Sequence, residues 1–170
     1  MHRARPPKHP NMRSPEEIAI RQAESGDVEG IRQCLRAAFE PYRSDYTAGA
    51  YLDTVPDEAG ILQRVEHMHV LVAVAPDVIA GTVSAALGSV EGHLRGMAVR
   101  PEWRGSGLSA LLLHPIENWL GSKGCKRVTL DTVLPLQAAI RFYEKNGYRR
   151  TGRVTDLYGM PLVDYVKEIG

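Results

Sequence analysis

The chain has 170 residues, of which 44% are hydrophobic and 24% are charged, and its formal net charge is +1 at pH 7. A balance of this kind predicts a globular protein with a real core and argues against the strong positive field of a nucleic-acid binder. No apolar run approaches the ~20 residues of a membrane-spanning helix, and the two cysteines lack disulfide or metal-site spacing. We therefore expect a cytoplasmic protein with free thiols, no metal, and neither membrane nor nucleic acid as a partner.

The first fifteen residues differ from the rest in composition. Residues 1–15 hold four basic residues, no acidic residue and four prolines. A segment with so many prolines and no apolar periodicity cannot form a packed element, and it lacks the apolar core of a secretory signal. The sequence thus predicts a disordered basic arm over 1–15 and a single domain over 16–170.

Elements in the first part of the domain can be assigned from periodicity and turn residues. A short strand is expected at 18–22, and Asp27 is expected to cap a helix that runs to about Phe39. From Glu40 to Asp57 the pattern is lost, so an irregular connection is expected there, and long connections of this type are often functional. A short helix is expected at 58–67.

Strands then alternate with helices up to the end of the chain. Two strands separated by Pro76 and Asp77 predict an antiparallel hairpin. Asn146 and Gly147 are a strong signal for the end of a helix, and Gly159 to Pro161 for a turn between the last strands. Seven strands and four helices are predicted in all. The elements after residue 68 are strands at 69–75, 78–86, 94–99, 126–133, 148–157 and 162–169, and helices at 106–120 and 136–146.

The stretch LRGMAVRPEWRGSGLS, residues 94–109, joins a strand to a helix through a glycine-rich turn. Unpaired N–H groups and the positive end of the helix dipole converge at such a turn and favour an anionic group. The spacing of Gly105 and Gly107 fits neither a Walker loop nor a dinucleotide fingerprint. By itself the turn is compatible with a phosphate site or with a simple glycine-capped connection.

Two segments resemble motifs of the GNAT superfamily of N-acetyltransferases. Arg104, Gly107 and, less well, Ser109 match the pattern R/Q-x-x-G-x-G/A of motif A. The segment AAIRFYEKNGYRRTG, residues 138–152, resembles motif B, A-x-x-L/F-Y-x-K-x-G-F/Y. The order of predicted elements also resembles this family from about residue 18 to residue 169. The resemblance implies an α/β (α+β) fold with a mixed, mainly antiparallel sheet of about seven strands flanked by about four helices.

The resemblance also implies a co-substrate and a reaction. Acetyl-CoA would lie between the strands at 94–99 and 126–133 and give its acetyl group to a primary amine of a small molecule or peptide, by direct attack in a ternary complex. Freed main-chain groups of Met97, Ala98 and Val99 would hold the pantetheine arm and polarise the thioester. A homodimer is left open. The pyrophosphate would lie on Arg104, Gly105, Ser106, Gly107, Leu108 and Ser109.

Two residues are candidates for proton transfer. His93 precedes motif A by the interval at which histone-acetylating relatives carry a glutamate base, and a histidine can accept a proton near neutral pH. Tyr143 occupies the motif B position that points toward the cofactor sulfur, where a phenol could protonate the leaving thiolate. A structural role stays open for both, since strand ends and helix cores also hold such residues. Weaker candidates for the base are Glu91, His67 and His69.

Two departures from the family pattern affect the expected cofactor site. Leu136 stands where the family often has an asparagine, and Gln137 is an open substitute. Pro115 lies inside the helix after motif A and should kink it. Two other functions stay open: a GNAT-fold module that binds acyl-CoA or another ligand without catalysis, and a nucleotide or nucleic-acid binding domain.

Overall fold

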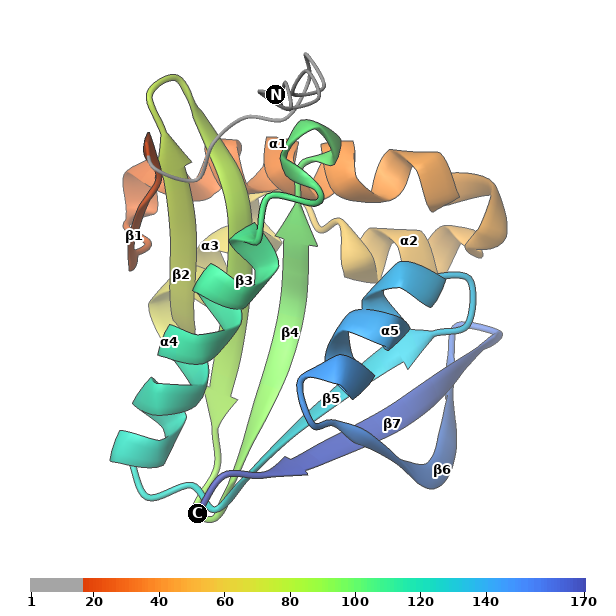
Figure 1. The fold of residues 1–170 in the computed structure, drawn as a ribbon. Helices are drawn as coiled ribbons and strands as arrows, with labels where there is room; N and C mark the ends of the chain where they lie inside the picture. The colour runs from red at the N-terminus through yellow and green to blue at the C-terminus, as the bar shows by residue number, and fades with distance from the viewer. Residues whose placement is uncertain (1–16) are drawn as a thin grey trace, which may run out of the picture.

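Seven strands form one sheet in the order β1-β2-β3-β4-β5-β7-β6 in the computed structural model, which describes residues 17–170 (Figure 1). All neighbouring strands are antiparallel except β4 and β5, which are parallel. The mixed, mainly antiparallel sheet is therefore confirmed, whereas the arm predicted over 1–15 lies outside the described residues. The strands are β1 (Ala19–Gln22), β2 (His69–Ala75), β3 (Val78–Leu87), β4 (Glu91–Val99), β5 (Arg127–Val133), β6 (Arg149–Leu157) and β7 (Met160–Glu168).

The central strands are apolar on both sides because helices cover both faces of the sheet. In β2, Leu71 and Ala73 belong to the core that includes helix α4 (Leu108–Ser122), while Val70 and Val72 belong to the core beneath α1 (Val28–Phe39) and α3 (Glu58–His67). Alternate side chains of a strand point to opposite faces, so α4 and the α1–α3 pair lie on opposite sides. Cys34 and Cys125 are buried free thiols.

Helix α5 (Gln137–Lys145) lies in front of β5 and β7 in Figure 1. Its residues Ile140 and Tyr143 join the same core as α4. Asn146 is the C-cap of this helix, and Gly147 has the left-handed φ of 91°, which confirms the predicted end. β6, at the edge of the sheet, is exposed along nearly its whole length.

The segment predicted as an irregular connection is helical, so residues 17–170 hold five α-helices rather than the four predicted. A 3₁₀ helix spans Glu40–Asp45 and α2 spans Ala48–Thr54. Thr47 caps α2 by accepting a hydrogen bond from the Ala50 N–H at 3.3 Å, and Ala50 is fully buried. The prediction failed because a helix of two turns is too short to display an apolar period.

Local details of three other elements also differ from the predictions. Asp27 does not cap α1 with its side chain; its carboxylate accepts from the Glu24 N–H at 2.8 Å and pairs with Arg21. Residues 158 and 159, both with positive φ, form the turn between β6 and β7, and Pro161 lies inside β7. A two-residue loop with positive φ at both positions matches the twist of a hairpin.

Helix α4 runs continuously through Pro115. Pro115 and Leu111 are both exposed, so the carbonyl that loses its hydrogen bond lies on the solvent side of the helix. The apolar face is formed by Leu108, Leu112 and Ile116, without Leu111, which is 43% exposed. No helix among the described residues has the length and apolar character needed to cross a membrane.

Candidate active site

The two parallel strands separate halfway along their length. They pair from Glu91 opposite Arg127 to Leu94 opposite Leu130, and beyond these positions both strands continue without pairing to each other. Gly96 has a φ of +63°, and the β3–β4 register shifts there, so β4 carries a bulge at this point. The main chain of β4 after residue 94 is therefore free of its parallel neighbour.

A cavity of ≈ 640 Å³ opens at this separation. We call one side the glycine-turn end and the opposite side the charged end. The glycine-turn end is lined by Met97, Ala98, Val99, Arg104, Gly105, Ser109 and Tyr143. The charged end is lined by Tyr42, Tyr46, Asp53, Arg64, His93, Arg95 and Asp131.

The glycine-turn end presents unpaired backbone N–H groups. Gly105 and Gly107 both have left-handed φ values, of 75° and 85°, which set the turn that starts α4. The first hydrogen bond into the helix runs from the Leu111 N–H to the Gly107 carbonyl at 3.3 Å. The N–H groups of Leu108 to Ala110 come before this bond, and the helix has no carbonyl one turn earlier that could accept from them. This helix start is suited to an anionic group.

Not every predicted cofactor-binding residue lines the cavity. Ser106, Gly107 and Leu108 do not, and of these Leu108 is buried and Ser106 donates its hydroxyl to the Trp103 carbonyl. Arg104 lines the cavity but donates from Nη2 to the Ala38 carbonyl at 3.0 Å, which ties the turn to the end of α1. At this end the main chain, rather than charged side chains, is available to a ligand.

Tyr143 reaches the cavity from α5. Its side chain is 8% exposed and packs between the rings of Phe142 and Tyr148, with centroid distances of 5.6 and 5.7 Å. Burial raises the pKa of the Tyr143 phenol above its usual value. Its hydroxyl has no hydrogen-bond partner within residues 17–170. The phenol therefore stays protonated at neutral pH and has a proton to donate.

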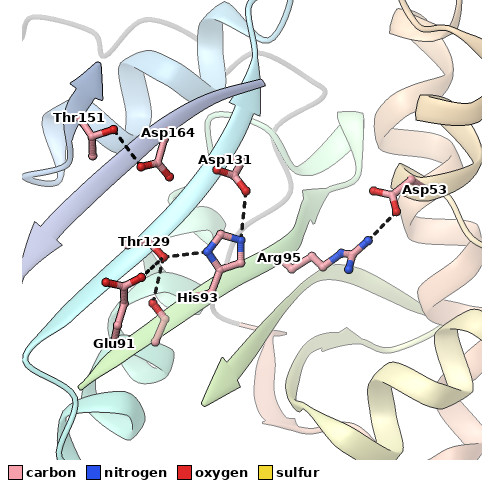
Figure 2. Close-up of polar contacts among 9 residues, drawn as sticks. Asp53, Glu91, His93, Arg95, Thr129, Asp131, Thr151 and Asp164 are labelled. Carbon is pink, nitrogen blue, oxygen red and sulfur yellow. Dashed lines mark hydrogen bonds and ion pairs between the residues drawn. The ribbon is translucent and has the colours of Figure 1, made fainter. Parts of the chain in front are cut away.

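His93 lies between two partners from the neighbouring strand, as Figure 2 shows. Its Nδ1 is 2.8 Å from the Thr129 hydroxyl, and its Nε2 is 3.3 Å from the Asp131 carboxylate. The parallel register places Thr129 opposite His93, and Asp131 follows on the same face of β5. A protonated ring keeps both contacts, because Nε2–H can donate to Asp131 and Nδ1–H to Thr129. Both ring nitrogens of His93 thus have a hydrogen-bonding partner on β5.

Asp131 faces a second carboxyl group. Asp164 lies directly opposite it on β7, and the Thr151 hydroxyl donates to Asp164 at 2.9 Å. The hydrogen bond from His93 lowers the pKa of Asp131, whereas burial and the neighbouring Asp131 carboxylate raise the pKa of Asp164. The pair thus favours an ionised Asp131 beside a more readily protonated Asp164.

Two arginines and one aspartate complete the charged end. Arg95 Nη2 donates to Asp53 Oδ1 at 2.7 Å (Figure 2), and Arg64 Nη2 donates to the Asp53 carbonyl at 2.9 Å. Burial and, secondarily, the charge of Arg95 lower the pKa of Arg64 to about 10. These contacts bring α2 and α3 up to the bulge in β4.

Sequence reasoning missed Asp53, Arg64, Arg95 and Asp131. Asp131 could have been found, since it is two residues after Thr129 on a predicted strand and so shares its face. Asp53 and Arg64 carry no such signal, because they reach the cavity only through the packing of two short helices. Of the weaker candidates for the base, Glu91 is paired with Arg127 at 2.7 Å, and His69 stacks on Trp119.

The departures in motif B have structural consequences. Leu136 lines the cavity as an apolar residue, and Gln137 donates its side-chain amide to the Leu134 carbonyl, so it does not replace the missing asparagine. In the part of the chain that the structure describes, no group of three or more His, Cys, Asp or Glu side chains is arranged to hold a metal.

Known proteins share both the sequence pattern and the fold. A sequence profile described as "Acetyltransferase (GNAT) family" matches residues 29–148. An aminoglycoside N(6')-acetyltransferase type 1 of Stenotrophomonas maltophilia is 31% identical over 86 residues, 51% of this chain and 53% of that protein, so the chain spans about half of its length. An uncharacterized N-acetyltransferase of Methanocaldococcus jannaschii is 27% identical over 137 residues, 78% of each chain.

Solved structures agree in fold. The PaiA N-acetyltransferase of Thermoplasma acidophilum, in complex with coenzyme A, has a TM-score of 0.75 at 19% identity. The match covers 89% of this chain and 99% of that chain. Ard1 of Thermoplasma volcanium has a TM-score of 0.73 at 17% identity, with 91% of this chain and 99% of that chain covered. Since the family profile spans most of this chain, which also has the fold of these acetyltransferases, the chain belongs to the GNAT family of acetyltransferases.

Proposed function

We propose that this protein transfers the acetyl group of acetyl-CoA to a primary amine in a ternary complex. The observation that supports this most is that one cavity joins the freed main chain of β4 and the open start of α4 to the His93–Asp131 pair. A thioester and an amine must meet in one enclosed space for direct transfer.

The glycine-turn end fits acetyl-CoA. The N–H groups at the start of α4 would hold the pyrophosphate, with Arg104 fixing the turn from behind. The main chain of Met97 to Val99 would hold the pantetheine arm and stabilise negative charge on the thioester oxygen. The co-substrate supplies an activated acyl group, and the chain's own residues position it.

Two side chains would move protons. His93 would take the proton of the attacking amine, directly or through water, and Asp131 would stabilise the ring once it is charged. Tyr143 would donate to the departing thiolate, because its buried phenol stays protonated. Asp131 takes part in the role of His93 through its contact with the ring at 3.3 Å.

The test is release of free thiol from acetyl-CoA with a panel of primary amines: polyamines, aminoglycosides, amino acids, amino acid amides and short peptides. We expect release that depends on one class of amine, with the acetylated product visible by mass spectrometry. Acetyl-CoA that binds and raises the melting temperature, yet releases no thiol with any amine, would instead support the non-catalytic module. A response to polyphosphate or DNA but not to acetyl-CoA would favour the nucleotide binder.

A further inference from the structure

Arg64 is the charged side chain at the charged end that has no oppositely charged group within ion-pair distance among the described residues. It lies on α3 and lines the cavity, and its one hydrogen bond within residues 17–170 goes to the Asp53 carbonyl, which is neutral. No carboxylate in that part of the chain lies within ion-pair distance of it. A largely buried guanidinium without a carboxylate is costly unless a ligand supplies the anion.

The neighbouring charges do not provide that anion. Asp53 gives its carboxylate to Arg95 at 2.7 Å, and Asp131 gives its carboxylate to His93 at 3.3 Å. Burial and the charge of Arg95 lower the pKa of Arg64, and the Asp53 carboxylate, which is engaged by Arg95, offsets this only in part. The charged end therefore has a surplus positive charge at Arg64 and a carboxylate–imidazole pair at Asp131 and His93.

Arg64 is also placed beside the reacting region. A Cβ at Gly96 would lie 2.8 Å from Arg64 Nη1, so the guanidinium rests against the bulge of β4 where a side chain is missing. The next residues of β4 are Met97 to Val99, which we propose to hold the thioester. A group bound by Arg64 would accordingly lie close to the attacking amine of the same molecule.

From this arrangement we infer that the acetyl acceptor is a small amine that also carries a carboxylate, such as a free amino acid, and that Arg64 binds the carboxylate. The inference rests on the proposed function. Guanidinium and carboxylate form a planar pair with parallel hydrogen bonds, which suits recognition of one end of a small ligand. The amine at the other end would face the His93–Asp131 pair.

The first experiment compares each free amino acid with its own C-terminal amide in the thiol-release assay. We expect kcat/KM to be about 10- to 100-fold higher for the acid of the preferred pair, the scale of one charged hydrogen-bonded contact. The comparison is conservative, because the amine of an amide is less basic and more of it is unprotonated at neutral pH. Equal rates for acid and amide would overturn the inference while leaving the proposed function intact.

The second experiment assigns the preference to Arg64. Arg64→Gln can still donate to the Asp53 carbonyl but has no charge, so the acid-to-amide ratio should fall to about 1, because the KM for the acid rises far more than the KM for the amide. Arg64→Lys should keep part of the ratio. Arg100→Gln is the matched control, because Arg100 also donates to a carbonyl, that of Ile79 at 3.0 Å, but does not line the cavity.

Several outcomes would contradict the assignment. A structural role of Arg64 predicts equal losses for acid and amide in Arg64→Gln, with the ratio unchanged. Should that variant fail to fold, an Arg64→Lys enzyme with the full wild-type ratio and unchanged KM would also speak against a planar arginine–carboxylate pair. If neither the free amino acids nor their amides support thiol release, the proposed function itself is overturned, and the inference with it.

Discussion

The two ends of the cavity are built from different parts of the chain. The glycine-turn end comes almost entirely from one continuous stretch, residues 97–109, and presents backbone N–H groups. The charged end gathers side chains from α2, α3, β4 and β5, which are separated along the sequence and meet only in the fold. One end is set by main-chain conformation, and the other is set by residue identity.

This difference separates two tasks. Backbone groups stay the same when side chains change, so a turn that fixes their directions can hold the same acyl donor in chains of low identity. Side chains at the charged end can be exchanged without disturbing that turn. The acceptor is therefore expected to depend on residues such as Asp53 and Arg64, and the donor on the conformation of Gly105 and Gly107.

Tyr143 lines the glycine-turn end, and its substitution should have the largest effect. Tyr143→Phe keeps the ring between Phe142 and Tyr148, so the melting temperature and acetyl-CoA affinity should change little. Turnover should fall by roughly 10- to 10³-fold, the scale of one lost general acid. Steady-state kinetics with the best amine, together with ligand-induced thermal shifts, measure both quantities. Wild-type turnover with chemistry shown to be rate-limiting would make Tyr143 a core residue only.

His93 tests the chemistry of the charged end alone. His93→Gln keeps a polar side chain beside Thr129 and Asp131 but cannot act as a base at neutral pH. We expect turnover to fall by about 10²-fold, with acetyl-CoA binding unchanged, and the acid limb of the rate profile to flatten. The measurement is kcat against pH from 6 to 9. If the variant matches the wild type over that range, water or another residue takes the proton.

The same division explains what the sequence could predict. Every strand and four helices were placed from periodicity and turn residues. Such signals report local structure directly: Gly147 marks the end of a helix, and the apolar residues of β2 mark a buried strand. Motif A located the glycine-turn end, since its signal is a continuous stretch. Arg64 gave no signal, because its place beside Gly96 depends on how α2 and α3 pack on the sheet.

The glycine-turn end can be probed without changing its conformation. Gly107 has a φ of +85°, and a Cβ there would meet no atom within 4 Å, so Asn and Asp, which tolerate positive φ, should both fit. Gly107→Asp adds a negative charge at the start of α4, and Gly107→Asn is its neutral control. We expect acetyl-CoA to bind about 10-fold more weakly to the Asp variant than to the Asn variant, the effect of about 1.4 kcal/mol of repulsion. Titration calorimetry measures the ratio, and equal affinities would place the pyrophosphate elsewhere.

Asp164 should give the smallest effect, on stability rather than turnover. Burial and the Asp131 carboxylate raise the pKa of Asp164 in the folded state, so the folded protein binds the proton more tightly than the unfolded chain does. The free energy of unfolding therefore decreases as pH rises from the ordinary Asp pKa to the raised pKa of Asp164. At neutral pH, above both values, the full decrease remains. Asp164→Asn removes the charge, while its amide can still accept from Thr151 and donate to Asp131.

The expected result is a small rise in the melting temperature of Asp164→Asn at pH 7 that disappears at about pH 3, where both proteins are neutral at this position. Asp45→Asn is the control for net charge, since Asp45 is exposed and is not among the groups that shift the pKa of Asp131 or Asp164. Thermal unfolding of the three proteins at both pH values gives the comparison. A rise that is equal at pH 3 and pH 7, or that Asp45→Asn reproduces, would mean that the gain does not come from relieving repulsion between Asp131 and Asp164.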